Sequence, residues 1–179
     1  MQSTLFIAGN PYASNSQFLA LVEAELRPQG LQWISLAEEN GPNGFDIQKH
    51  QSTLEEADTI IVHFPMYWYS SPALVKSWLD ALLTPGWAFP QEVSKLRGKR
   101  IVLSVTTGSP LDTFQPTGSN ERTLEDLLLP FERMAKYCGM NWLGVVASQW
   151  NTEKANAEVL QATALSHTQA VLDRINARA

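Results

Sequence analysis

Short apolar runs alternate along the chain with segments in which apolar residues recur every three or four positions. Runs such as TLFIA and DTIIVHF, bounded by polar turns, are typical of strands that are buried on both faces of a sheet. The alternating segment LQWISL also favours a strand. The pattern predicts five strands, at 4–8, 31–36, 58–64, 100–105 and 141–148.

Helical periodicity fills the intervals between these strands. Five strands separated by helices indicate an α/β fold whose parallel sheet is covered on both faces. Segment 37–45, with Asn-Gly and Pro-Asn-Gly sequences, and the polar segment 109–120 are predicted to be loops. The predicted helices are 17–26, 47–57, 73–83, 121–137 and 153–178, with Ser71 before Pro72 read as an N-cap followed by proline at the first helical position.

Composition favours a subunit interface. The 179 residues contain no linker and no repeat, so we expect a single domain over 1–179. Charged residues make up 17% of the chain, against about 25% in a typical domain. With six Trp, this leaves more neutral and aromatic surface than a free monomer usually exposes.

Charge and residue types exclude several classes of protein. A net charge of −5 argues against a nucleic-acid binder or an anionic-membrane binder, because both need a concentrated basic face. Cys138 is the single cysteine, and the three His residues lack metal-ligand spacing, so we expect no metal site and no disulfide. No signal peptide and no membrane-spanning run is evident, which predicts a cytoplasmic protein.

Ligands of open α/β sheets bind beyond the carboxyl ends of the strands, where three loops are predicted here. The first loop offers Asn10, Ser14, Asn15 and Ser16 at the start of a helix, where free N–H groups and the helix dipole suit a phosphate. It has no G-x-G-x-x-G fingerprint and no Walker lysine. The alternative for this loop is a capping box formed by Ser14 and Gln17.

The second loop, 65–70, carries three aromatic residues and a Met in succession. These could form a wall for a flat aromatic ligand, and their burial against a helix or a second subunit is an equal alternative. In the third loop, 106–109, small side chains and Gly108 let the backbone approach a ligand, with a simple tight turn as the alternative. Together the loops favour a ligand with a phosphate and a planar ring, as in FMN.

Three other features have structural interpretations. His63 lies within a predicted strand and is interpreted as a packed histidine rather than a base. Cys138 follows a helix and is interpreted as a small buried hydrophobe. The basic segment 95–100 is interpreted as a solvated turn, with contact to a cofactor phosphate as the alternative.

Three segments of the chain carry a resemblance to known proteins: HFPMYWYSSPALVKSWLDALLTPGWAF, SVTTG and PFERMAKYCGMNWL. They resemble the flavodoxin-like NAD(P)H:quinone oxidoreductase family, and within it the ancillary proteins of bacterial glutathione-regulated potassium-efflux systems. The resemblance implies a flavodoxin-like three-layer sandwich with a five-stranded parallel sheet of order 2-1-3-4-5. It also implies a homodimer with flavin at the subunit interface, where hydride passes from NAD(P)H through FMN, or FAD, to a quinone.

The resemblance also implies positions for the cofactor. Asn10 would lie at its phosphate end, where the family usually has His. Ser109 replaces the second Gly of the usual TTGG, and Phe114 replaces a Tyr that serves in a phenol–imidazole proton relay in mammalian-type enzymes. Ser16, Gln17 and Phe18 would lie along the phosphate and ribityl chain, Pro65, Met66, Tyr67 and Trp68 beside the ring, and Thr106, Thr107, Gly108 and Ser109 at its pyrimidine side.

The expected function is a flavin-dependent NAD(P)H oxidoreductase. Four residues are assigned catalytic roles: the N–H groups of Gly108 and Ser109 would stabilise charge on the reduced ring, Trp68 would position the ring, and Phe114 would shape the substrate side. The alternative is a regulatory subunit that docks on a potassium-efflux antiporter, peripheral to the inner membrane, with weak or no enzymatic activity. A flavin-dependent azo- or nitroreductase is a third hypothesis.

Overall fold

The computed structural model describes residues 3–150 and 156–177. Five strands form one parallel sheet in the order β2-β1-β3-β4-β5, so the first and third strands are neighbours in its middle. The expected order 2-1-3-4-5 is therefore confirmed. The strands are β1 (Thr4–Ala8), β2 (Gln32–Ser35), β3 (Thr59–Pro65), β4 (Arg100–Thr107) and β5 (Asn141–Gln149).

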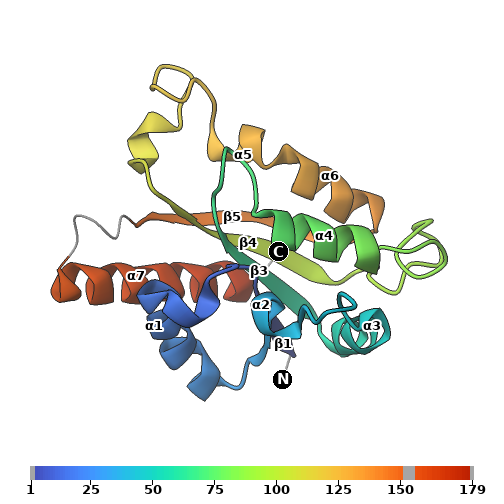
Figure 1. The fold of residues 1–179 in the computed structure, drawn as a ribbon. Helices are drawn as coiled ribbons and strands as arrows, with labels where there is room; N and C mark the ends of the chain where they lie inside the picture. The colour runs from blue at the N-terminus through green and yellow to red at the C-terminus, as the bar shows by residue number, and fades with distance from the viewer. Residues whose placement is uncertain (1–2, 151–155, 178–179) are drawn as a thin grey trace.

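Helices cover both faces of this sheet and form the two outer layers of a three-layer sandwich (Figure 1). One face packs against α1 (Gln17–Leu26) and α7 (Ala157–Asn176), and the other against α3 (Ile47–Glu56), α4 (Ala73–Leu82) and α6 (Leu129–Tyr137). Shorter elements are α2 (Leu36–Glu39), α5 (Leu124–Leu127) and 3-10 turns at Ala13–Asn15, Arg27–Gln29 and Leu111–Thr113.

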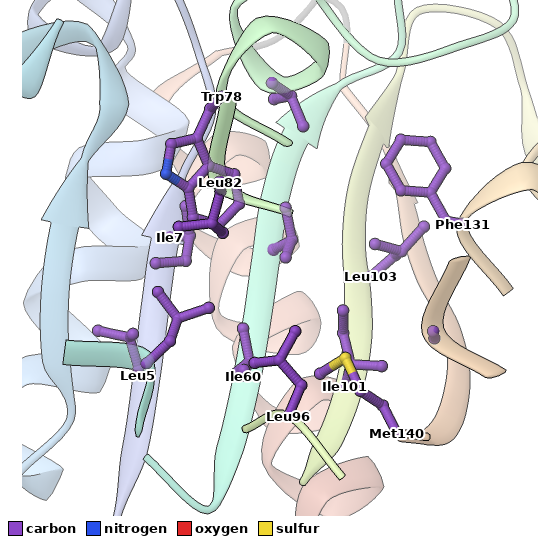
Figure 2. Close-up of a cluster of buried hydrophobic side chains, with 14 of the residues drawn as sticks. Leu5, Ile7, Ile60, Trp78, Leu82, Leu96, Ile101, Leu103, Phe131 and Met140 are labelled. Atoms are coloured by element: carbon purple, nitrogen blue, oxygen red, sulfur yellow. The ribbon is translucent and has the colours of Figure 1, made fainter. Parts of the chain in front are cut away.

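Successive strand residues point to opposite faces, so each strand contributes to two separate cores. In β3, Ile60, Val62 and Phe64 face the layer of α3, α4 and α6, while Ile61 and His63 face α1 and α7. Figure 2 shows the first of these cores, where buried side chains of the sheet meet those of the helices: Leu5, Ile7, Ile60, Trp78, Leu82, Leu96, Ile101, Leu103, Phe131 and Met140.

The predicted helix 121–137 is two helices in the structure, α5 and α6. Pro130 lies in the first turn of α6. A proline inside a continuous helix would lack the N–H needed for its backbone bond and would clash with the preceding turn. The chain therefore ends α5, which Thr123 and Asp126 begin with a capping box, and starts a new helix at Leu129.

Helices α1 and α4 begin at Gln17 and Ala73 as predicted, but the residues predicted to cap them are corrected. Ser16, not Ser14, caps α1, because its hydroxyl oxygen accepts the N–H of Leu19 at 3.2 Å. Pro72 is the N-cap of α4 rather than its first helical residue: its ψ of 151° is extended, and its carbonyl accepts the N–H of Val75 at 3.1 Å. Neither Ser71 nor Pro72 provides a side-chain cap there.

Other boundaries differ slightly from the prediction. The predicted loop 37–45 begins with most of the single-turn helix α2, and β4 runs two residues further than predicted, to Thr107. The last helix, predicted at 153–178, is described as Ala157–Asn176, and its predicted residues 153–155 and 178 lie outside the described residues.

Gly9 sets the distance between the end of β1 and the start of α4. A Cβ at Gly9 would lie 2.3 Å from Val75 Cγ2 and 3.0 Å from the carbonyl oxygen of His63. The Gly9 N–H donates to that same carbonyl at 2.7 Å. Only glycine permits this close approach, which brings the loop after β1 against the end of β3.

Candidate functional site

Two adjoining hollows lie at the carboxyl edge of the sheet, where the segments after β3 and β4 rise on the same side (Figure 1). They share Met66, Thr107 and Gly108, and together reach the size of small-molecule sites, roughly 300–1,000 Å³. The inner hollow, of about 370 Å³, is lined also by Asn10, Tyr12, Asn15, Ser16, Phe18, His63, Pro65, Tyr67, Thr106 and Trp150. The outer hollow, of about 270 Å³, is lined also by Trp68, Tyr69, Ser109, Phe114 and Asn120.

The structure brings together all the residues predicted for the site except Ser14 and Gln17, which are exposed and line neither hollow. The three predicted loops therefore converge on one place, as their positions after parallel strands required.

One end of the inner hollow is suited to an anion. The first-turn N–H groups of a helix have no intrahelical partners, and Ser16 satisfies only that of Leu19 in α1. Asn10 accepts the N–H of Tyr12 through Oδ1 at 2.9 Å, which leaves its carboxamide NH₂ as a donor. No Lys or Arg lines either hollow among the described residues. An anion here would be held by neutral donors and the helix dipole.

The aromatic loop after β3 has a strained backbone. Tyr67 and Ser70 exchange two backbone hydrogen bonds of 2.9 and 3.0 Å around a two-residue turn. The central residues, Trp68 and Tyr69, have φ values of 49° and 66°, a region that costs a non-glycine residue about 1–3 kcal/mol. Trp68 is 94% exposed, so no packing within this chain offsets that strain. Residues held this way are typical of ligand and partner sites.

The loop after β4 presents backbone donors to both hollows. Thr107 donates its hydroxyl to the carbonyl of Ser109 at 2.8 Å, and its own carbonyl accepts the N–H of Trp150 at 2.8 Å. A Cβ at Gly108 would meet no atom within 4 Å. The N–H groups of Gly108 and Ser109 have no hydrogen-bond partner among the described residues. A ligand could therefore reach this backbone and accept from it.

The loop 109–120 closes the outer hollow with an apolar side chain. Phe114 is only 7% exposed and lines the hollow beside Asn120. Asn120 fixes the loop, since its Nδ2 donates to Thr113 Oγ1 at 2.7 Å and its backbone N–H donates to the Thr113 carbonyl at 3.1 Å. Phe114 has no hydroxyl, so the phenol–imidazole relay cannot operate at this position.

Sequence reasoning missed several lining residues, of which His63 is the most informative. The packed position is confirmed, because His63 is 2% exposed, yet it also lines the inner hollow. Burial, and next His167, lower its pKa to about 3, so it is neutral at pH 7. Its position two residues before the end of β3 was an available signal. The other missed residues are Tyr12, Asn120 and Trp150.

Two features lie away from the hollows. Cys138 is buried, as expected, and burial raises the pKa of its thiol. The basic segment 95–100 precedes β4 at the amino edge of the sheet, opposite the hollows. There Lys99 Nζ donates to the carbonyls of Glu55 and Ala57 at 2.7 and 2.6 Å. The alternative that this segment contacts a phosphate in the site is therefore wrong.

This fold defines a flavodoxin-like protein with a candidate ligand site at the carboxyl edge of its sheet. A family model described as flavodoxin-like fold matches residues 2–171, and the chain belongs to that family. Among residues 3–150 and 156–177, no helix has the length and apolar character required to cross a membrane.

Individual relatives refine the comparison. General stress protein 14 of Bacillus subtilis is 43% identical over 60% of this chain, and the match spans 62% of that relative's length. Glutathione-regulated potassium-efflux system ancillary protein KefF of Enterobacter sp. is 34% identical over 94% of this chain and 95% of its own.

Two solved structures are similar over almost their whole length, both at 28% identity. General stress protein 14 from Treponema denticola in complex with FMN has a TM-score of 0.86, covering 97% of this chain and 99% of its own. An NADPH-quinone reductase from P. pentosaceus has a TM-score of 0.80, covering 95% and 97%.

Proposed function

We propose that this protein binds FMN in the joined hollows and transfers hydride from NAD(P)H to quinones or similar acceptors. The observation that carries the proposal is the unpartnered pair of N–H groups at Gly108 and Ser109, two residues that line hollows also lined by the start of α1. Similarity to a protein in complex with FMN and to an NADPH-quinone reductase supports it.

The residues present fit FMN. The phosphate would accept from Ser16, from the first-turn N–H groups of α1 and from the Asn10 carboxamide. Met66 and Tyr67 would lie beside the isoalloxazine ring, whose polar edge accepts from Gly108 and Ser109. FAD remains an alternative cofactor for the same donors.

Bound FMN would supply the ring that takes up and releases hydride, while the chain holds it and sets its surroundings. The N–H groups of Gly108 and Ser109 would donate to the edge of the ring on which negative charge accumulates. Trp68 and Phe114 would position the ring and limit the space over it. Phe114 neither holds nor moves a proton, so the acceptor's proton would come from another donor or from solvent.

Two glycine substitutions test the site. Gly108→Val adds a side chain into open space, so we expect an unchanged melting temperature and loss of FMN uptake. Gly41→Ala is the control, because its Cβ would meet only the Gly44 carbonyl at an ordinary 3.7 Å, away from the hollows. FMN binding to Gly108→Val with the unmodified affinity would contradict the proposed position of the ring.

An absorbance spectrum from about 300 to 550 nm, before and after anaerobic NADPH or NADH, tests the reaction itself. We expect a bound-flavin spectrum that bleaches on reduction and recovers with a quinone. Azo dyes and nitroaromatics in place of the quinone test the third hypothesis. A protein that takes up neither FMN nor FAD would refute the proposed function.

We further propose that the active form is a homodimer. Trp68, Tyr69 and Tyr12 are exposed around the hollows by 94%, 53% and 65%. A groove of the α4–α6 layer is lined by Leu79, Leu83, Phe131 and Met134, by the ion pair of Lys76 and Asp80, and by Ser70 of the same loop. A second copy on this groove would cover both surfaces and complete the wall of the site.

Sedimentation velocity of Leu79→Glu tests the dimer. A carboxylate in the groove should convert a dimer to a monomer, because Lys76 already pairs with Asp80 and a further buried negative charge is costly in an interface. The control is Leu165→Glu on α7, a residue already 52% exposed, which should leave the dimer intact. A dimeric Leu79→Glu would place the subunit contact elsewhere.

The second candidate function is a regulatory subunit of a potassium-efflux antiporter, which would bring the protein to the membrane surface. Its support is the similarity to an ancillary protein of such a system over almost the whole chain. Binding of the purified protein to the cytoplasmic domain of the antiporter tests it, with and without FMN. Absence of binding in both states would leave the enzymatic function alone.

A further inference from the structure

Four polar side chains form one hydrogen-bonded chain inside the apolar layer between the sheet and helices α1 and α7. His63 Nδ1 lies 2.9 Å from Ser104 Oγ, and Ser104 Oγ lies 2.7 Å from His167 Nε2. His167 Nδ1 lies 2.9 Å from Ser148 Oγ. The chain thus crosses β3, β4, α7 and β5, and it contains two of the three histidines of the sequence.

The surroundings of this polar chain are apolar. His63, Ser104 and His167 are at most 2% exposed. Phe18 packs against both imidazoles, with ring centroids 6.3 Å from His63 and 5.5 Å from His167, and Phe6 stacks on His63 at 5.6 Å. Burying this many polar groups is favourable only where each is satisfied, which makes the arrangement specific.

One nitrogen of this hydrogen-bonded network, His63 Nε2, has no partner within the network and is open to the site. His63 uses Nδ1 for Ser104, and its Nε2 has no hydrogen-bond partner among the described residues. That nitrogen is also absent from the fully enclosed unpaired atoms, which are Ser35 Oγ and His50 Nε2. Because His63 lines the inner hollow, its Nε2 is open to whatever occupies that hollow.

The single hydroxyl proton of Ser104 links the tautomer of His63 to that of His167. Ser104 has one hydroxyl proton between two ring nitrogens, so it donates to one and accepts from the other. If Ser104 donates to His63, then His63 carries its proton on Nε2 and presents a donor to the hollow. If Ser104 donates to His167, then His63 carries its proton on Nδ1 and presents an acceptor. Burial lowers the pKa of His167 to about 4, so both rings stay neutral.

We propose that His63 binds the polyol part of the cofactor through Nε2, and that Ser104, His167 and Ser148 are positioning residues that set whether Nε2 donates or accepts. The inference rests on the proposed function. His63 lines the inner hollow from β3, which lies in the sheet between β1, followed by Asn10, and β4, followed by Gly108. The part of FMN between phosphate and ring is the ribityl chain, whose hydroxyl groups both donate and accept.

Three flavins and one variant test the contact. FMN and riboflavin have the ribityl chain, and lumiflavin has the ring without it. His63→Phe should lower the affinity for FMN and for riboflavin about tenfold, because one buried hydrogen bond is lost. The affinity for lumiflavin should be unchanged. The affinities are measured by quenching of flavin fluorescence. Equal weakening of all three flavins, or of none, would overturn the proposal.

The positioning role needs a variant that keeps His63. Ser104→Ala removes the hydrogen bond that links His63 to His167. It should lower the affinity for riboflavin about threefold and shift the tautomer-sensitive ¹⁵N resonances of His63. Unchanged His63 resonances would overturn that role. His50→Phe is the control, since His50 is buried on the opposite face of the sheet. If the unmodified protein bound none of the three flavins, the proposed function would fall first, and this inference with it.

Discussion

The two faces of the sheet use alternate residues of the same strands, yet they are filled differently towards the carboxyl edge. On the face of α3, α4 and α6, β4 contributes Leu103 and Val105, and the strand residues of that core are apolar (Figure 2). On the face of α1 and α7, it contributes Ser104, which joins His63 and His167. One face therefore stabilises the fold, and the other also carries side chains suited to a ligand.

Substitutions at two neighbouring residues of β4, Leu103 and Ser104, test this difference between the two faces most directly. Leu103→Ala should lower the free energy of unfolding by about 2–5 kcal/mol, because it leaves a cavity at a fully buried position. Ser104→Ala should cost about 1–3 kcal/mol by leaving ring nitrogens unpaired. Urea unfolding gives both values, and flavin titration the affinities. If Leu103→Ala, and not Ser104→Ala, changed flavin affinity, the division between the faces would be wrong.

The same comparison predicts a pH dependence. The pKa values of His63 and His167 are lowered in the folded protein, to about 3 and about 4, so the unfolded chain binds more protons below its own histidine pKa near 6.5. Their contribution is complete above pH 6.5 and is lost as the pH falls. When the pH is lowered from 7 to 5.5, the two histidines together should lower the free energy of unfolding by about 2.5 kcal/mol.

Urea unfolding at several pH values measures this slope. His50, whose pKa burial also lowers, adds to it, whereas the lowered carboxyl pKa values of Glu39 and Asp126 act below this range. His63→Phe should reduce the pH dependence of the unfolding free energy by the contribution of one histidine. A slope unaffected by that substitution would mean that His63 is not buried in its neutral form.

The sequence predicted the order of strands and helices because continuous apolar runs and helical periodicity depend on which faces are buried. It predicted the convergence of the loops because parallel strands end at one edge. The sequence-based prediction failed at residues whose roles depend on the residues packed around them. Ser14 and Ser16 both fit a cap, and only the 3-10 turn before α1 selects Ser16. His63 looked like core because its partners, Ser104 and His167, are 41 and 104 residues away in the chain.

The smallest expected effect concerns the strained turn outside both cores. Trp68 has a φ of 49° and is 94% exposed, so Trp68→Gly should relieve the backbone without loss of packing. We expect unfolding free energy to rise by about 0.5–1 kcal/mol in the isolated chain, while flavin retention falls. Tyr69→Gly, with a φ of 66° and 53% exposure, is the matched variant. A Trp68→Gly protein that gained stability and kept its flavin would show that the strain at this turn serves the subunit contact rather than the cofactor.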